Sequence, residues 1–536
     1  MKKYVFACVM SFLCLTAAQR AQAGGPPKDA VSNQAMAGTM GPGRVIEVPS
    51  SAVAYAPTAA EIAAREQLMA AKSMHLAPAL GPHTTAADVV RPLGTPTDVT
   101  GEQANNTFTV FKTSLINSGG SQSTVNEPSV ANAGGKTVET SNWNIAYSNN
   151  GGAATITWAN QNPYAISPGY CCDTQVLYDK DRDVFILMLL DYNGEGASTN
   201  GLTISVSKSL FPSTGPAWCT YKFTGGNFGE GGTDTLDFAK IAISNSNLYL
   251  TWNDYPPSQG WRASGLARFP LDALASCAGF SYNYLLRNTE FTFALAQQTS
   301  THNQFWWVSN WMTDGTVNGS NLRIFWWPEN SGSYFGVTRG INPYTFGGNN
   351  PAGCGWCGRL DPRYESVVIT PAEYRAEANS AFGGDEVLEV ATTSGPGGGD
   401  PQNYVVYNYF HLNSVGYIGS DTTFNNSISF AYPGCAVNER GYVGCAMAQG
   451  AGAAGGLIVL QDADNPTEPW GYSFVVGGIS GASNWGDYVV TNPWQPGGGP
   501  FETVLWNYNS STGVNPYYIV WGRGRETNDY KRWKSK

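Results

Sequence analysis

From about Thr107 onward, short runs of β-branched and aromatic residues alternate with turns rich in Gly, Asn, Ser and Pro. Clear examples lie at 183–190, 247–252, 323–327, 404–410 and 502–506. Such runs are typical of β-strands, and no long amphipathic helix interrupts them. The sequence therefore predicts a large all-β domain. Such a domain must protect the edges of its sheets, and a closed ring of sheets does so.

A loose unit recurs along this domain, and a polar residue opens each copy. We place these openings at Glu127, Asp173, Asp237, His302, Arg363, Tyr432 and Asp487, about 60 residues apart on average. Four strands with their turns and one longer loop fill a unit of this length. We therefore predict a β-propeller with seven blades, or with six if His302, the weakest opening, is not one. Two β-sandwiches with accidental spacing are the alternative fold.

The N-terminal part differs from the rest of the chain. Residues 1–23 read as a secretory signal, with Lys2 and Lys3 before an apolar run and Ala21-Gln22-Ala23 as the cleavage motif. An uncleaved anchor is the alternative. We expect 24–105 to be a flexible Ala- and Pro-rich leader with a short helix at 59–69, 106–528 to be the propeller, and 529–536 to be a polar tail.

Composition narrows the partners. Charged residues are 13% of the chain and the formal net charge is −10, which argues against nucleic acid as a partner. No segment after the signal has about 18 consecutive apolar residues, so we expect no membrane insertion once the signal is removed. The protein is then secreted, periplasmic or at the cell surface. Its oligomeric state is left open.

Eight cysteines remain after the signal, and an even number in an exported chain favours disulfides. Cys435 and Cys445 flank a turn at 438–441, which suits a bridge between two strands. Cys354 and Cys357 have redox-motif spacing but lie in a Gly- and Pro-rich loop, so we predict a local structural bridge there. The other pairings stay open.

Several short elements resemble a known group. Residues 126–131 and 141–144 are followed by Ser148-Asn-Asn-Gly-Gly152 with Thr157-Trp158, and Asn484-Trp-Gly-Asp-Tyr488 lies near the C-terminus. On these elements the chain resembles exported sialidase-like β-propeller proteins with Asp-box (BNR) repeats. The resemblance implies a propeller fold and a role with carbohydrates.

The chain also departs from that group. Asn150 stands where the box has Asp, and three extra residues precede Thr157. The Phe/Tyr-Arg-Ile-Pro element that binds the substrate carboxylate in sialidases has no counterpart, and Glu127-Pro128 occupies the corresponding strand. An acid there would repel a sialic acid. The resemblance therefore does not imply a typical sialidase.

In a propeller, the openings of the inner strands converge at one end of the central channel. Two carboxyl groups about 5–5.5 Å apart, or about 6.5–9.5 Å apart, could then act on a glycosidic bond. The candidate catalytic residues are Glu127, Asp173, Asp237 and Asp487. The candidate ligand-binding residues are Arg363, His302, Tyr432, Asp234 and Glu365. The competing interpretation is that these acids only cap strands and turns.

No metal ligand set is assigned. Residues 179–183 are not an EF-hand start, because Val184 and Leu190 occupy the positions of its Gly and Glu, so we predict a hairpin turn. Two of the four mature histidines, His75 and His83, fall in the leader, which excludes a three-histidine zinc site inside the propeller. No cofactor is expected, although calcium in a loop or on the axis stays open.

Aromatic side chains that reach solvent could stack on sugar rings. A cluster is formed by Trp306, Trp307, Trp311, Trp326 and Trp327, most of which we expect to be buried between blades, with one or two reaching solvent. The expected function is therefore binding or cleavage of a glycan at the axial end, by a glycoside hydrolase or polysaccharide lyase. A non-catalytic lectin or adhesion module, or a cell-surface structural module, is the alternative.

Overall fold

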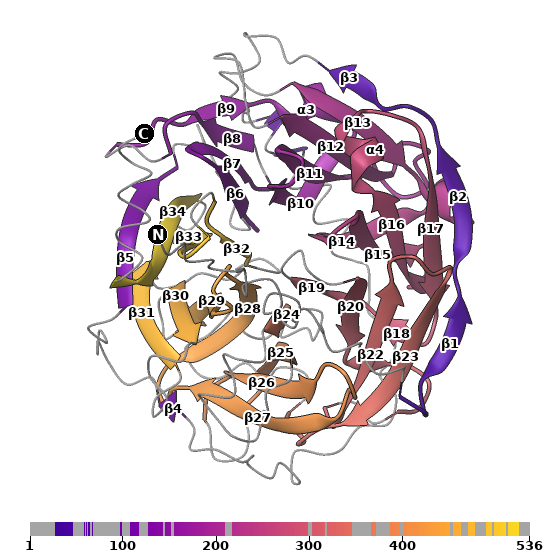
Figure 1. Cartoon of the computed structure of the whole chain (residues 1–536). Helices are drawn as coiled ribbons and strands as arrows, with labels where there is room; N and C mark the ends of the chain where they lie inside the picture. Colours follow the sequence, from indigo (N-terminus) through magenta and orange to yellow (C-terminus); the bar gives the residue numbers. More distant parts are fainter. Residues whose placement is uncertain are drawn as a thin grey trace, which may run out of the picture.

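Sheets of short antiparallel strands stand around a common axis like the blades of a propeller (Figure 1). The computed structural model describes residues 27–46, 97–98, 108–116, 127–142, 145–151, 155–208, 217–297, 303–316, 319–345, 366–370, 386–396, 401–450, 454–461, 470–476, 489–495, 498–510 and 513–524, and single residues between 58 and 67. The predicted all-β class and propeller arrangement are confirmed.

Five sheets have four or five strands each, and each forms one blade. The first blade consists of β6 (Ser129–Ala133), β7 (Lys136–Thr140), β8 (Ile145–Ser148) and β9 (Ala159–Gln161), and the second of β10 (Tyr170–Asp179), β11 (Val184–Asp191), β12 (Gly201–Lys208) and β13 (Trp218–Phe223). The third consists of β14 (Thr235–Ile243), β15 (Asn247–Tyr255), β16 (Ala263–Pro270) and β17 (Phe280–Arg287), and the fourth of β28 (Ser429–Val437), β29 (Val443–Gly450), β30 (Ala454–Gln461) and β31 (Trp470–Val476). The last consists of β32 (Thr491–Pro493), β33 (Phe501–Ser510), β34 (Gly513–Arg523) and β5 (Phe108–Leu115).

A further sheet has ten strands. Its main strands are β19 (Ala294–Gln297), β20 (Gln304–Ser309), β22 (Asn321–Pro328), β23 (Ser333–Gly340), β24 (Ser366–Thr370), β25 (Val387–Ser394), β26 (Tyr404–His411) and β27 (Tyr417–Phe424). Counted as separate sheets, the described part of the chain therefore has five blades of four or five strands, not the seven or six that the spacing predicts. The physical reason is that β19 and β24 pair in parallel, which merges their neighbours into one sheet.

The ring closes with a strand from before the first blade. β5 pairs antiparallel with β34, so residues 108–115 complete the sheet that contains residues 513–523. This pairing covers an edge that would otherwise expose unpaired backbone groups. The first and last sheets thereby become neighbours, and an apolar core that includes Val130, Ala146, Val504 and Tyr518 fills the space between them.

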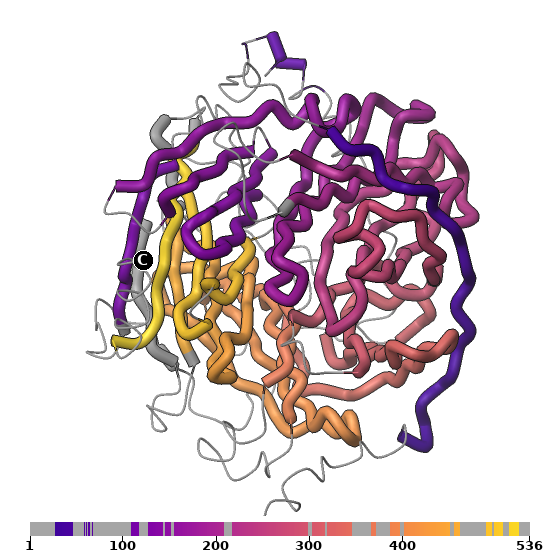
Figure 2. Tube along the Cα trace, turned by 45° about the horizontal axis from the view of Figure 1, so that its top comes forward, coloured from indigo at the N-terminus to yellow at the C-terminus, as the bar shows by residue number. Residues whose placement is uncertain are grey.

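The predicted flexible leader is partly built into strands. β1 (Val31–Gln34), β2 (Met36–Met40) and β3 (Arg44–Ile46) pair antiparallel with β23, β17 and β13, the outer strands of three sheets. Figure 2 shows this indigo tract running along the outside of the ring. We call residues 31–46 the N-terminal belt. The expectation of flexibility is corrected for this stretch, because the belt pairs with sheet edges that would otherwise be open.

The other described elements in the predicted leader, residues 24–105, are one short helical stretch and one two-residue strand. Residues 60, 61, 63, 64 and 67 are helical, and Thr58 and Glu61 form a capping box in which the Thr58 N–H donates to Glu61 Oε2 at 2.7 Å. β4 (Thr97–Asp98) pairs with β27.

A two-stranded sheet consists of β18 (Glu290–Phe291) and β21 (Trp311–Met312). The short helices are α3 (Pro163–Ile166), α4 (Leu271–Ala275) and the 3₁₀ turn η2 (Gly225–Phe228).

The core lies between sheets rather than in one centre. β11 reads Val-Phe-Ile-Leu-Met-Leu-Leu-Asp, and every residue of it is buried because neighbouring sheets cover both faces. Alternate residues of β11 belong to the cores on its two sides. This explains why the strands read as continuous apolar runs rather than as alternating ones.

The element at 148–158 that resembles an Asp box is held by its own hydrogen bonds. The Asn150 N–H donates to Ser148 Oγ at 3.1 Å, and the Thr157 N–H donates to Asn150 Oδ1 at 2.9 Å. Trp158 Nε1 donates to Ser114 Oγ of β5 at 3.4 Å. Asn150 thus accepts the backbone bond that ties the connection between β8 and β9.

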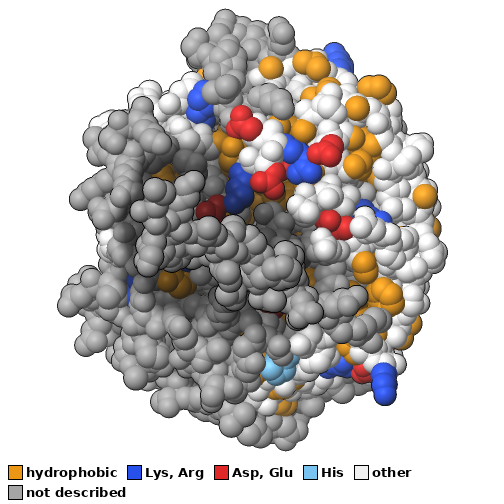
Figure 3. All heavy atoms as spheres, viewed as in Figure 1, with side chains coloured by type: hydrophobic (Ala, Val, Ile, Leu, Met, Phe, Trp, Pro, Cys, Tyr) orange, Lys and Arg blue, Asp and Glu red, His pale blue; other side chains and the backbone are white. Residues whose placement is uncertain are grey.

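The turns after the inner strands carry charge. The predicted hairpin turn at 179–183 joins β10 to β11, and its Lys180 Nζ lies 2.7 Å from Glu439 Oε1 in the β28–β29 turn. Arg182 Nε lies 2.6 Å from Asp272 Oδ1 of α4. Figure 3 shows acidic and basic side chains gathered over the part of the ring that Figure 1 labels β10, β11 and α4. These ion pairs tie together turns that are far apart in the sequence.

Candidate functional site

The first strand of each of the five blades, together with β19 and β24 of the ten-stranded sheet, lies nearest the axis. Figure 1 shows β6, β10, β14, β19, β24, β28 and β32 around the centre. The parallel pairing of β19 with β24 shows that these two inner strands run in one direction. Because the chain enters each sheet at its inner strand, we expect the beginnings of the inner strands to meet at one end of the channel. We call this end the axial mouth.

Backbone strain is concentrated at the axial mouth. Among the described residues, nine non-glycine residues have positive φ, and five of them lie within three residues of the beginning of an inner strand: Glu127 (49°), Asp173 (42°), Phe238 (53°), Thr292 (64°) and Tyr432 (58°). The pairing of β10, β14 and β28 with their neighbours shifts register at the same places. This left-handed region is unfavourable for bulky and β-branched side chains. Strain of this kind clusters at functional sites.

Three of these strained residues are held by the blade before them. The Asp173 N–H donates to Asn142 Oδ1 at 2.9 Å, the Thr292 N–H to Ser264 Oγ at 2.8 Å, and the Tyr432 N–H to Thr393 Oγ1 at 3.0 Å. Each acceptor belongs to the preceding blade or half-sheet. The strained conformation is therefore fixed by contacts between blades.

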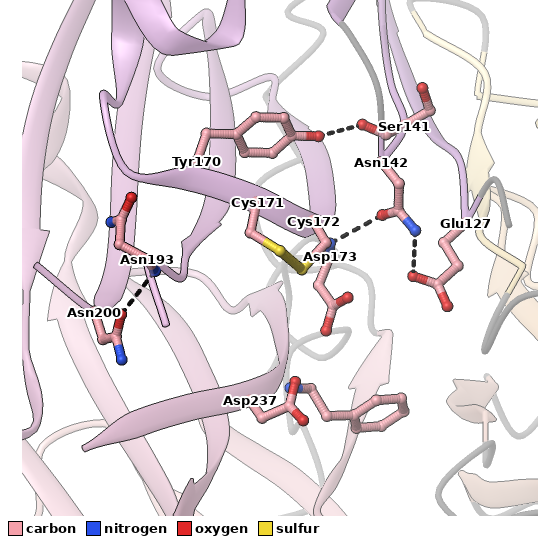
Figure 4. Close-up of a disulfide and its surroundings, with 11 residues drawn as sticks. Glu127, Ser141, Asn142, Tyr170, Cys171, Cys172, Asp173, Asn193, Asn200 and Asp237 are labelled. Carbon is pink, nitrogen blue, oxygen red and sulfur yellow. Dashed lines mark hydrogen bonds between the residues drawn. A yellow bond between two sulfur atoms is a disulfide. The ribbon is translucent and has the colours of Figure 1, made fainter. Parts of the chain in front are cut away.

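Three candidate carboxylates occupy the axial mouth side of β6, β10 and β14. Glu127, Asp173 and Asp237 are each at most 5% exposed. Asn142 Nδ2 donates to Glu127 Oε2 at 2.9 Å, and the Phe238 N–H donates to Asp237 Oδ1 at 2.7 Å. In Figure 4 the carboxyl groups of Asp173 and Asp237 point toward the same space. The structure thus places Asp173 and Asp237 on the neighbouring inner strands β10 and β14, and Glu127 two residues before β6.

A disulfide between adjacent residues precedes Asp173. Cys171 and Cys172 are bonded to each other and fully buried (Figure 4). The register of β10 against β11 shifts on both sides of Cys172. The sequence analysis left this pairing open, although two neighbouring cysteines in a chain with an even cysteine count are a visible signal.

The other bridges are structural. Cys435 pairs with Cys445 across β28 and β29, as predicted from the turn between them. Cys219 pairs with Cys277, a bridge the sequence analysis did not assign. Cys354 and Cys357 lie outside the described residues.

A cavity of about 80 Å³ lies among the inner strands. Its walls include Phe238, Phe293, Tyr432 and Val490, and Lys240 is the one charged side chain among the described residues that line it. The Lys240 ammonium lies 4.8 Å from the centre of the Phe238 ring. The described lining is therefore mixed: apolar rings, uncharged polar side chains such as Gln175 and Thr491, and Lys240 as its one charged side chain.

Four charged side chains form a cluster beside the mouth that the sequence analysis mostly missed. Arg262 Nη2 lies 2.7 Å from Asp234 Oδ2, 2.7 Å from Asp254 Oδ2 and 3.7 Å from Glu230 Oε1. Burial, together with the neighbouring carboxylates, raises the pKa of Glu230 and of Asp254 well above the usual range, while Arg262 opposes the rise. Asp234, a predicted ligand-binding residue, serves here as a partner of Arg262.

Glu230 and Asp254 were missed for a definite reason. Glu230 lies in the connection that precedes β14, and Asp254 lies at the end of β15, the second strand of that blade. The sequence search looked at inner-strand openings alone. Because antiparallel strands return to the same end of the sheet, the ends of second strands also reach the axial mouth.

The structure starts the unit that the sequence analysis opens at His302 earlier in the chain, and the role of His302 itself stays a prediction. The inner strand of that unit is β19, which ends at Gln297, and the strained residue before it is Thr292. His302 follows the inner strand and lies outside the described residues. Arg363, Glu365 and Asp487 also lie outside them, so their roles stay predictions.

The aromatic prediction holds for the described cluster. Trp306, Trp307, Trp326 and Trp327 are buried, and Trp311 is half-buried. Within the described ranges, no group of three or more His, Cys, Asp or Glu side chains is arranged to hold a metal ion. No helix in those ranges is long and apolar enough to cross a membrane.

Comparison with known proteins gives no family. No family model matches the chain, and no curated protein matches it. A puromycin hydrolase is 12% identical with a TM-score of 0.37, and the matched region covers 72% of this chain but only 51% of that enzyme. The resemblance to sialidase-like proteins therefore stays an expectation.

Two other solved structures span most of both chains. An ulvan lyase of a polysaccharide lyase family, bound to -[GlcA(1-4)Rha3S]-, is 9% identical with a TM-score of 0.41 and coverage of 80% of this chain and 95% of that one. An α-L-arabinofuranosidase from Fusarium graminearum is 11% identical with a TM-score of 0.36 and coverage of 78% and 99%. The propeller arrangement itself rests on the sheets and the ring closure described above.

Proposed function

We propose that the protein is an exported propeller that binds a glycan at the axial mouth. The observation that carries this proposal is the set of acidic side chains Glu127, Asp173 and Asp237 on inner strands whose backbone is strained at the same end. Ionised carboxylates accept hydrogen bonds from pairs of sugar hydroxyls. Strain that neighbouring blades hold in place suits a site that must be rigid before its ligand arrives.

We also propose that the propeller has seven blades. β19 and β24 are both inner strands, and only two residue pairs join them. Each half of the ten-stranded sheet then supplies four main strands, as the separate blades do. Divided at that junction, the sheet gives two blades in addition to the five separate ones.

Export belongs to the proposal as well. The basic start, the apolar run and Ala21-Gln22-Ala23 support a cleaved signal, and three disulfides among the described residues suit an oxidising compartment. N-terminal sequencing of the protein recovered from a bacterial periplasm or medium should begin at Gly24. A retained Met1 in the exported fraction would contradict this.

The binding test uses the mature protein and a panel of polysaccharides on affinity gels. We expect retention on at least one glycan, and a loss of about tenfold or more in affinity for Asp173→Asn or Asp237→Asn, since hydrogen bonds to charged groups contribute about 1.5–3 kcal/mol. Asp181→Asn, in the turn at the far end of β10, is the matched control and should bind as wild type. Equal binding by all variants would place the site elsewhere.

Cleavage is the second candidate, because the carboxyl groups of Asp173 and Asp237 share one space (Figure 4). If one carboxyl acts as acid and the other as base or nucleophile, the enzyme is a glycoside hydrolase; proton abstraction from a uronate would make it a lyase. Arg363 is the proposed substrate clamp. Product release that stops in Asp173→Asn would establish catalysis, whereas retention without turnover would establish a lectin or adhesion module.

A further inference from the structure

Two half-buried tryptophans pack against the same phenylalanine beside the axial mouth. The rings of Trp261 and Trp311 lie 5.6 Å and 5.0 Å from that of Phe291, with interplanar angles of 84° and 74°. In such edge-on arrangements Phe291 covers at most one face of each indole. Among tryptophans with described side chains, only these two and Trp158 are not buried; the buried ones are Trp218, Trp252, Trp306, Trp307, Trp326, Trp327, Trp494, Trp506 and Trp521.

The strand topology places both indoles on the mouth side. Trp261 lies in the connection between β15 and β16, and β15 runs antiparallel to the inner strand β14, so its end returns to the mouth. Trp311 lies in β21, which pairs with β18 immediately before the strained Thr292. The two residues come from neighbouring blades and flank the same stretch of the mouth.

Hydrogen bonds connect this aromatic pair to the mouth. Trp261 Nε1 donates to Ser264 Oγ at 3.3 Å, and the same hydroxyl accepts from the Thr292 N–H at 2.8 Å. Asn253 Nδ2 donates to Thr292 Oγ1 at 2.5 Å, while Ser264 Oγ donates to Asn253 Oδ1 at 2.7 Å. The position of Trp261 is therefore coupled to the strained backbone of Thr292.

Arg262 adds hydrogen-bond donors next to Trp261. Its side chain is 42% exposed although its three carboxylate partners are buried. Every ion pair that the described residues make with this guanidinium uses Nη2. A guanidinium has five N–H donors, so Nε and Nη1 can donate to a ligand. Its orientation is already fixed by the carboxylates beneath it.

We propose that Trp261, Trp311 and Arg262 form a second glycan subsite, which binds a sugar ring next to the one at the axial mouth. The inference rests on the proposed function and adds the length of the ligand, which is an oligosaccharide of several units rather than a single sugar. The apolar C–H face of a pyranose stacks on an indole, and Arg262 Nε and Nη1 donate to its hydroxyl oxygens. We call these three residues the aromatic subsite.

The test compares chain lengths of the oligosaccharide series from whichever polysaccharide the mature protein retains. Trp261→Ala and Trp311→Ala should each weaken binding of the longer oligosaccharides by about tenfold, which corresponds to about 1.4 kcal/mol, while the shortest ligand that binds loses nothing. Trp158→Ala is the matched control, since Trp158 is also half-buried but packs on Tyr518 in another part of the ring. It should leave all affinities unchanged.

A second measurement does not depend on affinity. Acrylamide quenches the fluorescence of accessible indoles, and a long oligosaccharide should protect wild type and Trp158→Ala from quenching. The protection should be lost in the double variant Trp261→Ala/Trp311→Ala. Circular dichroism of each variant checks that the sheets are retained.

The outcomes separate the two proposals. If Asp173→Asn abolishes binding while both tryptophan variants bind every length as wild type does, the aromatic subsite is wrong and the axial mouth stands. A loss of the same factor for all lengths, or an equal loss in Trp158→Ala, also contradicts the subsite. If wild type binds no glycan, the proposed function itself fails.

Discussion

At the scale of single residues, unusual backbone conformations and buried charges gather at the axial mouth. Asp173 shows how one such position is built. A disulfide between Cys171 and Cys172 precedes it, its N–H is held by Asn142, and the amide of Asn142 also holds Glu127. Two acids on different blades are thus coupled through one asparagine. We infer that the disulfide and Asn142 position Asp173 rather than contact the ligand.

This inference gives a prediction for the disulfide. The double variant Cys171→Ser/Cys172→Ser should weaken glycan binding by about tenfold or more, because Asp173 loses the constraint on its strained backbone. Hydrogen exchange of the segment 170–179 should become faster in the same variant. Cys219→Ser/Cys277→Ser, the control, should lower thermal stability but keep binding and exchange at 170–179 unchanged. Unaltered exchange in the first variant would contradict a positioning role.

The residues that sequence reasoning found and missed differ in a physical way. Glu127, Asp173, Asp237 and Tyr432 were predicted as strand openings because a polar residue beside a turn marks the start of a strand, and each lies within three residues of the start of an inner strand. Thr292 was missed because nothing in a β-branched residue signals a positive φ. Glu230 and Asp254 were missed because contacts between a loop and a second strand have no sequence period.

At the scale of elements, the N-terminal belt is the clearest departure from the sequence prediction. Its side chains are mostly exposed, including Val31 at 62% and Val45 at 63%, so it shows no apolar alternation. The belt is held by backbone pairing with three outer strands and by the ion pair of Asp29 with Arg339. Such pairing depends on partners 170 or more positions away, which composition does not reveal.

The belt should protect the edges that it covers. Deletion of residues 24–46 should lower the melting temperature and produce dimers or larger species, because the outer edges of β13, β17 and β23 become exposed. Differential scanning calorimetry and light scattering measure both effects. The variant Arg339→Ala, which removes one ion pair but keeps the strands, should remain monodisperse if wild type is. An unchanged melting temperature after the deletion would show that the belt does not stabilise the ring.

At the scale of the whole molecule, the ring closes at the seam between the first and last blades, where their sheets share an apolar core. Two fully buried carboxyl groups occur there. Glu139 is paired in register with Val130 and Ala146 of the seam core, and Glu502 accepts a hydrogen bond from Tyr518 Oη at 2.9 Å. Burial raises the pKa of each to about 8. Both are therefore mainly protonated at neutral pH.

A pH dependence of stability follows. A carboxyl whose folded-state pKa is near 8, against 4.5 unfolded, stabilises the fold fully below pH 4.5, and this contribution is lost as pH rises to 8. The slope is at most about 1.4 kcal/mol per pH unit for each group. Glu139→Gln should gain stability over wild type as pH rises from 5 to 9, measured by urea unfolding. A difference between the two proteins that is constant over this range would contradict the prediction.

The belt and the closing strand also fix the order in which the chain can be completed. Val31 has its partner at Gly336, and Phe108 has its partner at Arg523, so the earliest strands to be synthesised wait for hundreds of later residues. A ribosome or translocon delivers the chain from its N-terminus, so these strands emerge before the partners with which they pair. The belt strands therefore cannot pair before β13, β17 and β23 have emerged, and β5 cannot pair before β34 of the last blade has emerged. A chain truncated before residue 513 has nothing to receive β5.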